Sequence, residues 1–140
     1  VMTPFSSWGP TDDGRIKPDV VANGFDVYST GANSNNHYFV MSGTSASSPN
    51  VSGSLGLLLQ YHKELYGDKP LLSSTIKALV IHTADEAGNN EGPDYQFGWG
   101  LMNTLKAVQV MKRNHERGGS HIYELALNQG SQITLQVYSN

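Results

Sequence analysis

The chain has 140 residues, of which 38% are hydrophobic, and its formal net charge is −3. This length suits one domain or a large part of one, and the apolar content argues against global disorder. The lysine and arginine residues are scattered, which argues against nucleic acid or an anionic membrane surface as a partner. No apolar run is long enough to span a bilayer. The lack of cysteine excludes disulfides, thiol nucleophiles and cysteine-bound zinc.

Short strands are predicted in the first part of the chain, where apolar pieces alternate with Gly and Pro. Residues 20–22 and 27–29 have the composition of brief strands bounded by turn-forming residues. Residues 37–41 form a third candidate strand, which ends directly before Ser42.

Three helices are predicted downstream of these strands. The first runs from about residue 45 to 66, the second from 73 or 74 to 83, and the third follows Asn103 as its N-cap. A polar loop at 85–93 separates the second helix from the third. The side chains expected to face the core, because they recur at helical spacing, are Val51, Leu55, Leu58, Leu59, His62, Leu65, Ile76, Leu79, Val80, Leu105, Val108 and Met111.

The pattern changes to alternation of apolar and polar residues after the glycine pair at 118–119. Residues 122–126 and 133–137 are predicted to be two strands joined by a turn around 128–130. We expect this hairpin to open a β-rich segment that is cut short at the end of the chain.

Pro49 indicates where the first helix starts. Proline inside a helix costs about 3 kcal/mol, but it is tolerated in the first turn, where the N–H groups have no intrahelical partner. The helix is therefore expected to begin at about Ser45 or Ala46. An oxyanion formed at the Ser45 hydroxyl would face the positive end of the helix dipole and its free N–H groups. Ser and Thr are also common helix caps, so the spacing alone leaves a capping role for Ser45 open.

The segment Gly43-Thr44-Ser45-x-Ser47-x-Pro49 resembles the signature around the active-site serine of subtilisin-like proteases. The resemblance extends over roughly residues 3–112 in register. Other segments that are similar to the same family are residues 5–10, 17–20, 28–30 and 95–103.

This resemblance implies an α/β fold. Residues 1–117 would be the C-terminal part of a subtilisin-like catalytic domain, a three-layer α/β/α sandwich around a mostly parallel sheet. Residues 118–140 would be the β-hairpin that starts a truncated C-terminal β domain. The resemblance also implies a serine endopeptidase with Ser45 as nucleophile, a peptide or protein substrate bound as an extended strand near residues 37–43, and Ser45, Thr44, Gly43 and Ser42 forming the oxyanion and substrate-binding segment.

The Asp and His motifs that the family places before the serine are absent from the chain. None of the five histidines is followed by Gly, and no residue can be assigned as the asparagine that supplies the second oxyanion donor. The chain is therefore expected to begin within a longer protein and to be inactive alone, because triad members act as a unit. An exposed sheet edge would let it pair with its missing N-terminal part or with itself. The high Asn, Ser and Gly content fits an exported protein, and we expect a secreted or cell-envelope location, periplasmic or extracellular, of bacterial type.

The acidic loop at residues 85–94 could hold calcium as a structural ion through oxygen ligands, although a solvated loop is favoured and no other cofactor or metal is implied. Ala46 stands where many bacterial members carry Met, which predicts tolerance to peroxide. An α/β-hydrolase elbow is excluded because Ser47 occupies its last glycine position. A catalytically inactive subtilase-like interaction or structural module is the remaining alternative.

Overall fold

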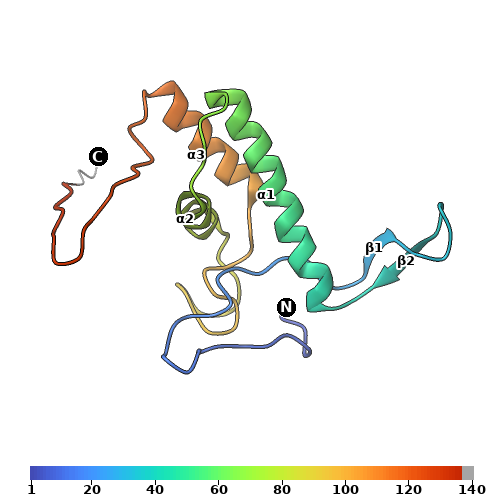
Figure 1. The fold of residues 1–140 in the computed structure, drawn as a ribbon. Coiled ribbons are helices and arrows are strands. Elements are labelled where there is room, and N and C mark those ends of the chain that lie inside the picture. Colours follow the sequence, from blue (N-terminus) through green and yellow to red (C-terminus); the bar gives the residue numbers. More distant parts are fainter. Residues whose placement is uncertain (137–140) are drawn as a thin grey trace.

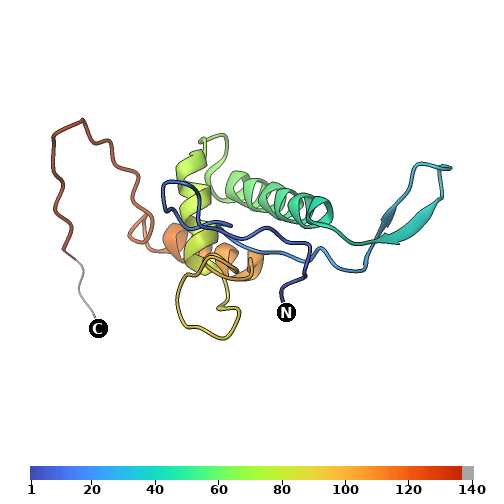
Figure 2. The ribbon, with the colours of Figure 1, turned by 90° about the horizontal axis from the view of Figure 1, so that it is seen from below.

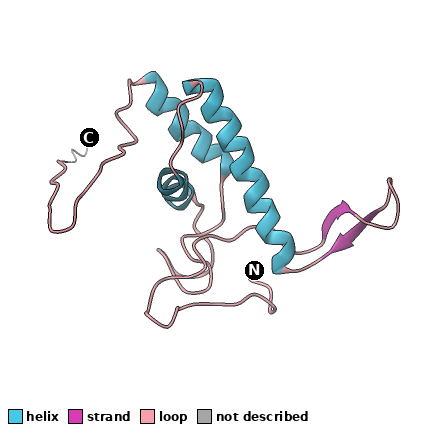
Figure 3. Cartoon of the chain, viewed as in Figure 1, coloured by secondary structure: helices cyan, strands magenta, loops and turns pink. Residues whose placement is uncertain are grey.

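A computed structural model describes residues 1–136 as a mixed α/β arrangement of two strands and three helices. The elements in chain order are β1 (Val27–Thr30), β2 (Tyr38–Met41), α1 (Thr44–Tyr66), α2 (Ser73–Thr83) and α3 (Thr104–Glu116). Figure 1 shows the strands projecting beyond the start of α1, and Figure 3 shows how much of the remaining chain is loop. In residues 1–136 no helix is both long and apolar enough to cross a membrane.

The core lies where the three helices meet. Leu58 of α1 and Met111 of α3 are the largest fully buried side chains, and Leu79 and Val80 of α2 pack with them. This confirms the predicted helices and most of their inward faces. Leu59 and Leu105 are exceptions, because 49% and 66% of their surfaces are exposed.

The buried stripe of α3 explains the error at Leu105. It consists of Ala107, Met111 and Asn114, spaced four and then three residues apart. Leu105 precedes Ala107 by two residues, which places it on the opposite side of a helix with 3.6 residues per turn. The predicted amphipathic period of α3 is therefore correct, but its predicted phase at the start of the helix is wrong.

β1 and β2 form an antiparallel hairpin in which Val27 is paired with Met41 and Thr30 with Tyr38. The strands predicted at 27–29 and 37–41 are thus confirmed, and β2 begins one residue later than expected. The hairpin extends away from the helices, and Figure 2 shows this from a second direction. It carries exposed aromatic side chains, of which Tyr28 and Tyr38 stack with ring centroids 5.4 Å apart.

The mostly parallel sheet is not formed within the described residues. The strand predicted at 20–22 contributes a single parallel bridge between Val21 and Leu101. There the N–H of Val21 donates to the carbonyl of Gly100, and the N–H of Met102 donates to the carbonyl of Val21, both at 2.9 Å. One bridge holds the two segments side by side without making a sheet.

The hairpin predicted after the third helix is also not formed in residues 118–136, where no strand occurs. The predicted turn is present, because the N–H of Ser131 donates to the carbonyl of Asn128 at 3.0 Å. An isolated two-stranded ribbon is marginal in water, so alternation of side chains alone does not produce a paired strand. Val137 lies outside the described residues, and the division of the chain at residue 118 stays a prediction.

Candidate active site at the start of α1

Ser45 is the second residue of α1, and its side chain is exposed. β2 ends at Met41 and α1 begins three residues later, so the strand determines where the start of α1 lies. The carbonyl of Gly43 accepts hydrogen bonds from the N–H groups of Ala46 (3.0 Å) and Ser47 (3.4 Å). These bonds fix the first turn and leave Ser45 at its outer end.

Two backbone donors lie beside the Ser45 hydroxyl. Within residues 1–136, the N–H groups of Thr44 and Ser45 have no acceptor, and no side chain caps the helix. Free N–H groups at a helix start bind anions well, because they coincide with the positive end of the helix dipole. The start of α1 therefore has the donors that a developing oxyanion requires.

Space is limited at Gly43, next to the candidate nucleophile Ser45. A Cβ atom at residue 43 would lie 3.1 Å from the Oγ atom of Ser45. Such a contact is tighter than nine in ten of those that real Cβ atoms make. A larger residue at this position would therefore require the Ser45 hydroxyl to move by a few tenths of an ångström.

Pro49 lies deeper in the helix than predicted. Since α1 begins at Thr44, Pro49 falls inside the helix and beyond its first turn. A proline has no N–H, so the carbonyl of Ser45, four residues earlier, lacks the donor that would normally pair with it. The helix starts earlier than the proline suggested because the bonds to Gly43, which local sequence does not reveal, begin it.

The first turn of α1 is also held by hydrogen bonds to residues 22–24. The Ser47 hydroxyl donates to the carbonyl of Ala22 at 3.1 Å, and the N–H of Gly43 donates to the carbonyl of Gly24 at 2.8 Å. Gly24 is buried, and a Cβ atom there would lie 2.1 Å from the Ser47 hydroxyl and 2.6 Å from the Gly43 carbonyl. The segment before β1 thus packs directly against the base of α1.

Ser42 is joined to Asp26 by two hydrogen bonds. The Ser42 hydroxyl accepts from the N–H of Asp26 at 2.9 Å and donates to its Oδ1 atom at 3.2 Å. Asp26 adopts a left-handed backbone conformation with φ of 49°. Asp26, Gly24 and Ser47 are supporting residues to which sequence reasoning assigned no role, because their partners are distant in sequence.

The Ser45 hydroxyl forms no hydrogen bond with any residue in the range 1–136, so no general base is in place there. His62 is buried on α1 against Tyr66, with ring centroids 4.7 Å apart, in agreement with its predicted place on the core-facing side of the helix. Burial lowers the pKa of His62, and the charge of Lys69 lowers it further. His82 is exposed on α2.

The acidic loop uses its carboxylates internally. Glu86 accepts from two loop N–H groups, and the Oδ1 atom of Asp94 accepts from two more. The hydrogen bond from Lys106, followed by that from Asn103, lowers the pKa of Asp85. In the described part of the chain no three acidic or histidine side chains are grouped to hold a metal ion. A calcium ion in this loop stays a prediction.

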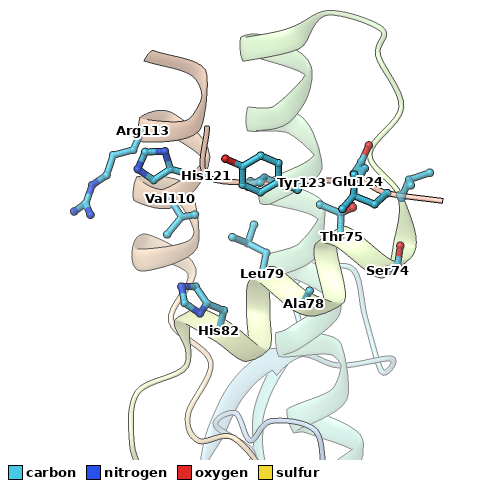
Figure 4. Close-up of a pocket in the computed structure, with 13 residues that line it drawn as sticks. Ser74, Thr75, Ala78, Leu79, His82, Val110, Arg113, His121, Tyr123 and Glu124 are labelled. Carbon is cyan, nitrogen blue, oxygen red and sulfur yellow. The ribbon is translucent and has the colours of Figure 1, made fainter. Parts of the chain in front are cut away.

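A separate cavity of about 540 Å³ lies between α2, α3 and residues 121–125 (Figure 4). Leu79 and Val110 line its apolar part, and His82, Arg113 and His121 lie around one side. Ser45 does not line this cavity.

Comparison with known proteins identifies relatives of this chain. A model of the subtilase family (peptidase S8) matches residues 1–100. The C5a peptidase of Streptococcus pyogenes is 49% identical over 67 residues, which are 48% of this chain and 6% of that protein. The PII-type proteinase of Lactococcus lactis subsp. cremoris is 34% identical over 130 residues, covering 81% of this chain and 7% of that proteinase.

A solved structure agrees with these relatives. The CspB protease of Clostridium perfringens superposes with a TM-score of 0.71 and 28% identity, over 81% of this chain and 24% of the protease. The chain thus spans less than a tenth of the two curated relatives and about a quarter of the solved protease. Because the family match covers more than half of its residues, the chain belongs to the subtilase family of serine peptidases.

Proposed function

We propose that this chain is the nucleophile-bearing part of a subtilisin-like serine endopeptidase, with Ser45 as the nucleophile. The observation that carries the proposal is the exposed Ser45 hydroxyl at the start of α1, next to the unpaired N–H groups of Thr44 and Ser45. Family membership supports the same reaction. The general base and its orienting carboxylate would come from polypeptide outside residues 1–140, as a histidine and an aspartate.

The reaction divides into two steps. The Oγ atom of Ser45 attacks the carbonyl carbon of the scissile peptide bond, while the histidine takes its proton. The resulting oxyanion would receive a hydrogen bond from the N–H of Ser45. The carbon–nitrogen bond then breaks, and the histidine returns the proton to the departing amine. Water hydrolyses the acyl-enzyme ester by the same route and restores the Ser45 hydroxyl.

The substrate would be a protein or peptide bound in extended form beside residues 37–43. Within the described residues β2 pairs only with β1, so its other edge is free to bond a further strand. An extended peptide that adds to a strand edge gains main-chain hydrogen bonds at every second residue. β2 leads directly to Ser42 and Gly43, so a peptide on that edge would reach the Ser45 hydroxyl.

Completion of the catalytic domain would cover apolar surface that is now exposed. Leu57 and Leu59 of α1 are 61% and 49% exposed, although the helix crosses the centre of the molecule. In the proposal, the N-terminal part of the same protein covers these residues and completes a three-layer α/β/α sandwich. Without that part, the same surface would promote self-association. A secreted or cell-envelope location in a bacterium fits a proteinase of this kind.

Hydrolysis of casein by the full-length protein that carries this chain tests the proposal. We expect Ser45→Ala to abolish hydrolysis. Ser52→Ala should retain it, because that hydroxyl donates only to the Ser48 carbonyl within the same helix. Equal activity of the Ser45→Ala variant and the wild type would contradict the assignment of the nucleophile. A folded full-length protein without any activity would favour the inactive subtilase-like module.

A further inference from the structure

We infer that Ser42 and Asp26 act as a pair of positioning residues that fix the backbone of Gly43, Thr44 and Ser45 for catalysis. The inference rests on the proposed function, since it concerns the reactivity of Ser45. It is carried by a reciprocal pair of hydrogen bonds at the end of the β1–β2 hairpin. Neither residue touches the reacting atoms, so both would act through the turn that carries Ser45.

The pair continues the register of the hairpin. Val27 is the last residue of β1 at this end and is opposite Met41 of β2. Asp26 and Ser42 are the next residues outward on each side, and two hydrogen bonds join them, at 2.9 and 3.2 Å. The side chain of Ser42 thus extends the ladder by one step beyond the last strand pair.

The next contact in the same direction reaches the turn itself. The N–H of Gly43 donates to the carbonyl of Gly24 at 2.8 Å, so the chain just beyond the Asp26–Ser42 pair is bonded as well. Only Thr44 separates Gly43 from Ser45. A shift of Ser42 would therefore be transmitted to the Ser45 hydroxyl and to the two free N–H groups beside it.

Asp26 adopts a conformation that needs support. Its φ of 49° lies in the left-handed region, which is unfavourable for residues other than glycine, although aspartate tolerates it better than most. Its N–H and its carboxylate both bond to the Ser42 hydroxyl, and these two bonds stabilise that conformation. Each partner therefore fixes the other, and removal of the Ser42 hydroxyl would release both.

The pair also connects the hairpin to the nucleophile. In the proposed function the substrate lies along β2, while the attacking atom belongs to α1. The Asp26–Ser42 bonds lie at the junction of these two elements. Fixing this junction would align the bound peptide bond with the Ser45 hydroxyl, which affects the rate of acylation more than the affinity for the peptide.

Both residues are exposed, so water competes for their hydrogen bonds and the expected effect is moderate. We expect Ser42→Ala to lower the maximal rate of Ser45 modification by about three- to tenfold. The concentration of reagent that gives half of the maximal rate should stay unchanged.

The test follows inactivation of the full-length protein by a fluorophosphonate, with kinact and KI measured separately for each variant. Ser42→Thr keeps the hydroxyl, so its kinact should be close to that of the wild type and above that of Ser42→Ala. Asp26→Asn keeps both hydrogen bonds and should react like the wild type. Ser52→Ala is the matched control, because it removes an exposed hydroxyl of α1 that bonds only to Ser48. Thermal unfolding identifies any variant that fails to fold.

Asp26→Gly provides a second route if Ser42→Ala does not fold. It permits the same φ, keeps the N–H donor and removes only the carboxylate, so a smaller loss of kinact is expected. An unchanged kinact in both Ser42→Ala and Asp26→Gly would overturn the inference while leaving the proposed function intact. A wild-type protein that does not react at all would overturn the proposed function and the inference with it.

Discussion

Gly24→Ala is the substitution that most directly tests the packing beneath the candidate nucleophile. Gly24 is buried under the start of α1 and is far from the Ser45 signature in sequence. An added Cβ atom would lie 2.1 Å from the Ser47 hydroxyl and 2.6 Å from the Gly43 carbonyl. The first contact involves a side chain that can rotate, whereas the second involves the backbone that carries Ser45.

The size of the effect follows from these two contacts. Rotation of Ser47 would relieve the first contact and would lose its hydrogen bond to Ala22, a cost of about 1 kcal/mol. Relief of the second contact requires movement of the Gly43 carbonyl. Overpacking of this kind typically costs about 1–3 kcal/mol of stability. A displacement of the nucleophile by about 1 Å can lower the rate as much as a hundredfold, so we expect a loss between about tenfold and a hundredfold.

The assay compares casein hydrolysis and thermal unfolding of the full-length protein with and without the substitution. Gly53→Ala is the matched control, because a Cβ atom at residue 53 of α1 would meet nothing within 4 Å. That control should be stabilising by about 0.5–1 kcal/mol and should keep full activity, since alanine favours a helix more than glycine does. A second substitution, Ser47→Ala, should not rescue Gly24→Ala, because the contact with Gly43 would persist. Wild-type activity of Gly24→Ala would refute this account of the packing.

Three further predictions concern other parts of the chain. Asn114 is buried, and its side-chain oxygen accepts hydrogen bonds from the N–H groups of residues 121–122 at 2.9 and 2.8 Å. Asn114→Ala should therefore destabilise the protein by about 1–3 kcal/mol and speed hydrogen exchange at those two amides. Unchanged exchange at these amides would contradict the prediction. Ala46 follows the candidate nucleophile in place of an oxidisable Met, so dilute peroxide should leave the activity intact, and rapid inactivation with modification near Ala46 would oppose this. The pKa of Asp85 is lowered from 3.8 in the folded state, so its contribution to stability is complete above that value and is lost as the pH falls below it. Lys106→Met should reduce this acid-dependent loss in a plot of melting temperature against pH, because the hydrogen bond from Asn103 remains, and an unchanged plot would argue against the ion pair.

The helices could be predicted from sequence because their signals are local. Asn103 is the predicted N-cap of α3, and its side chain accepts from the N–H of Lys106 at 2.9 Å. Core residues recur at helical spacing within each helical segment, as around Leu58 in α1 and Met111 in α3. The motif around Ser45 is equally compact, so a short stretch of residues is enough to propose the nucleophile.

The support of the site could not be predicted because it depends on contacts between distant segments. Asp26 and Ser42 are sixteen residues apart and meet only when the hairpin closes. The sequence does not indicate why residue 24 is a glycine. The structure explains it, because the carbonyl of Gly43 leaves no space for a Cβ atom there. The predicted strands at 122–126 and 133–137 illustrate the reverse problem, since a favourable alternation in one segment does not ensure a pairing partner in residues 118–136.

The most direct test of the central claim is peptide mass spectrometry of the fluorophosphonate adduct. The 140-residue chain, the full-length protein and its Ser45→Ala variant would be treated in parallel. Our account predicts an adduct on Ser45 of the full-length protein, little on the 140-residue chain, and none on the variant. A folded full-length protein without an adduct, or with the adduct on another serine, would contradict the assignment of Ser45 as the nucleophile.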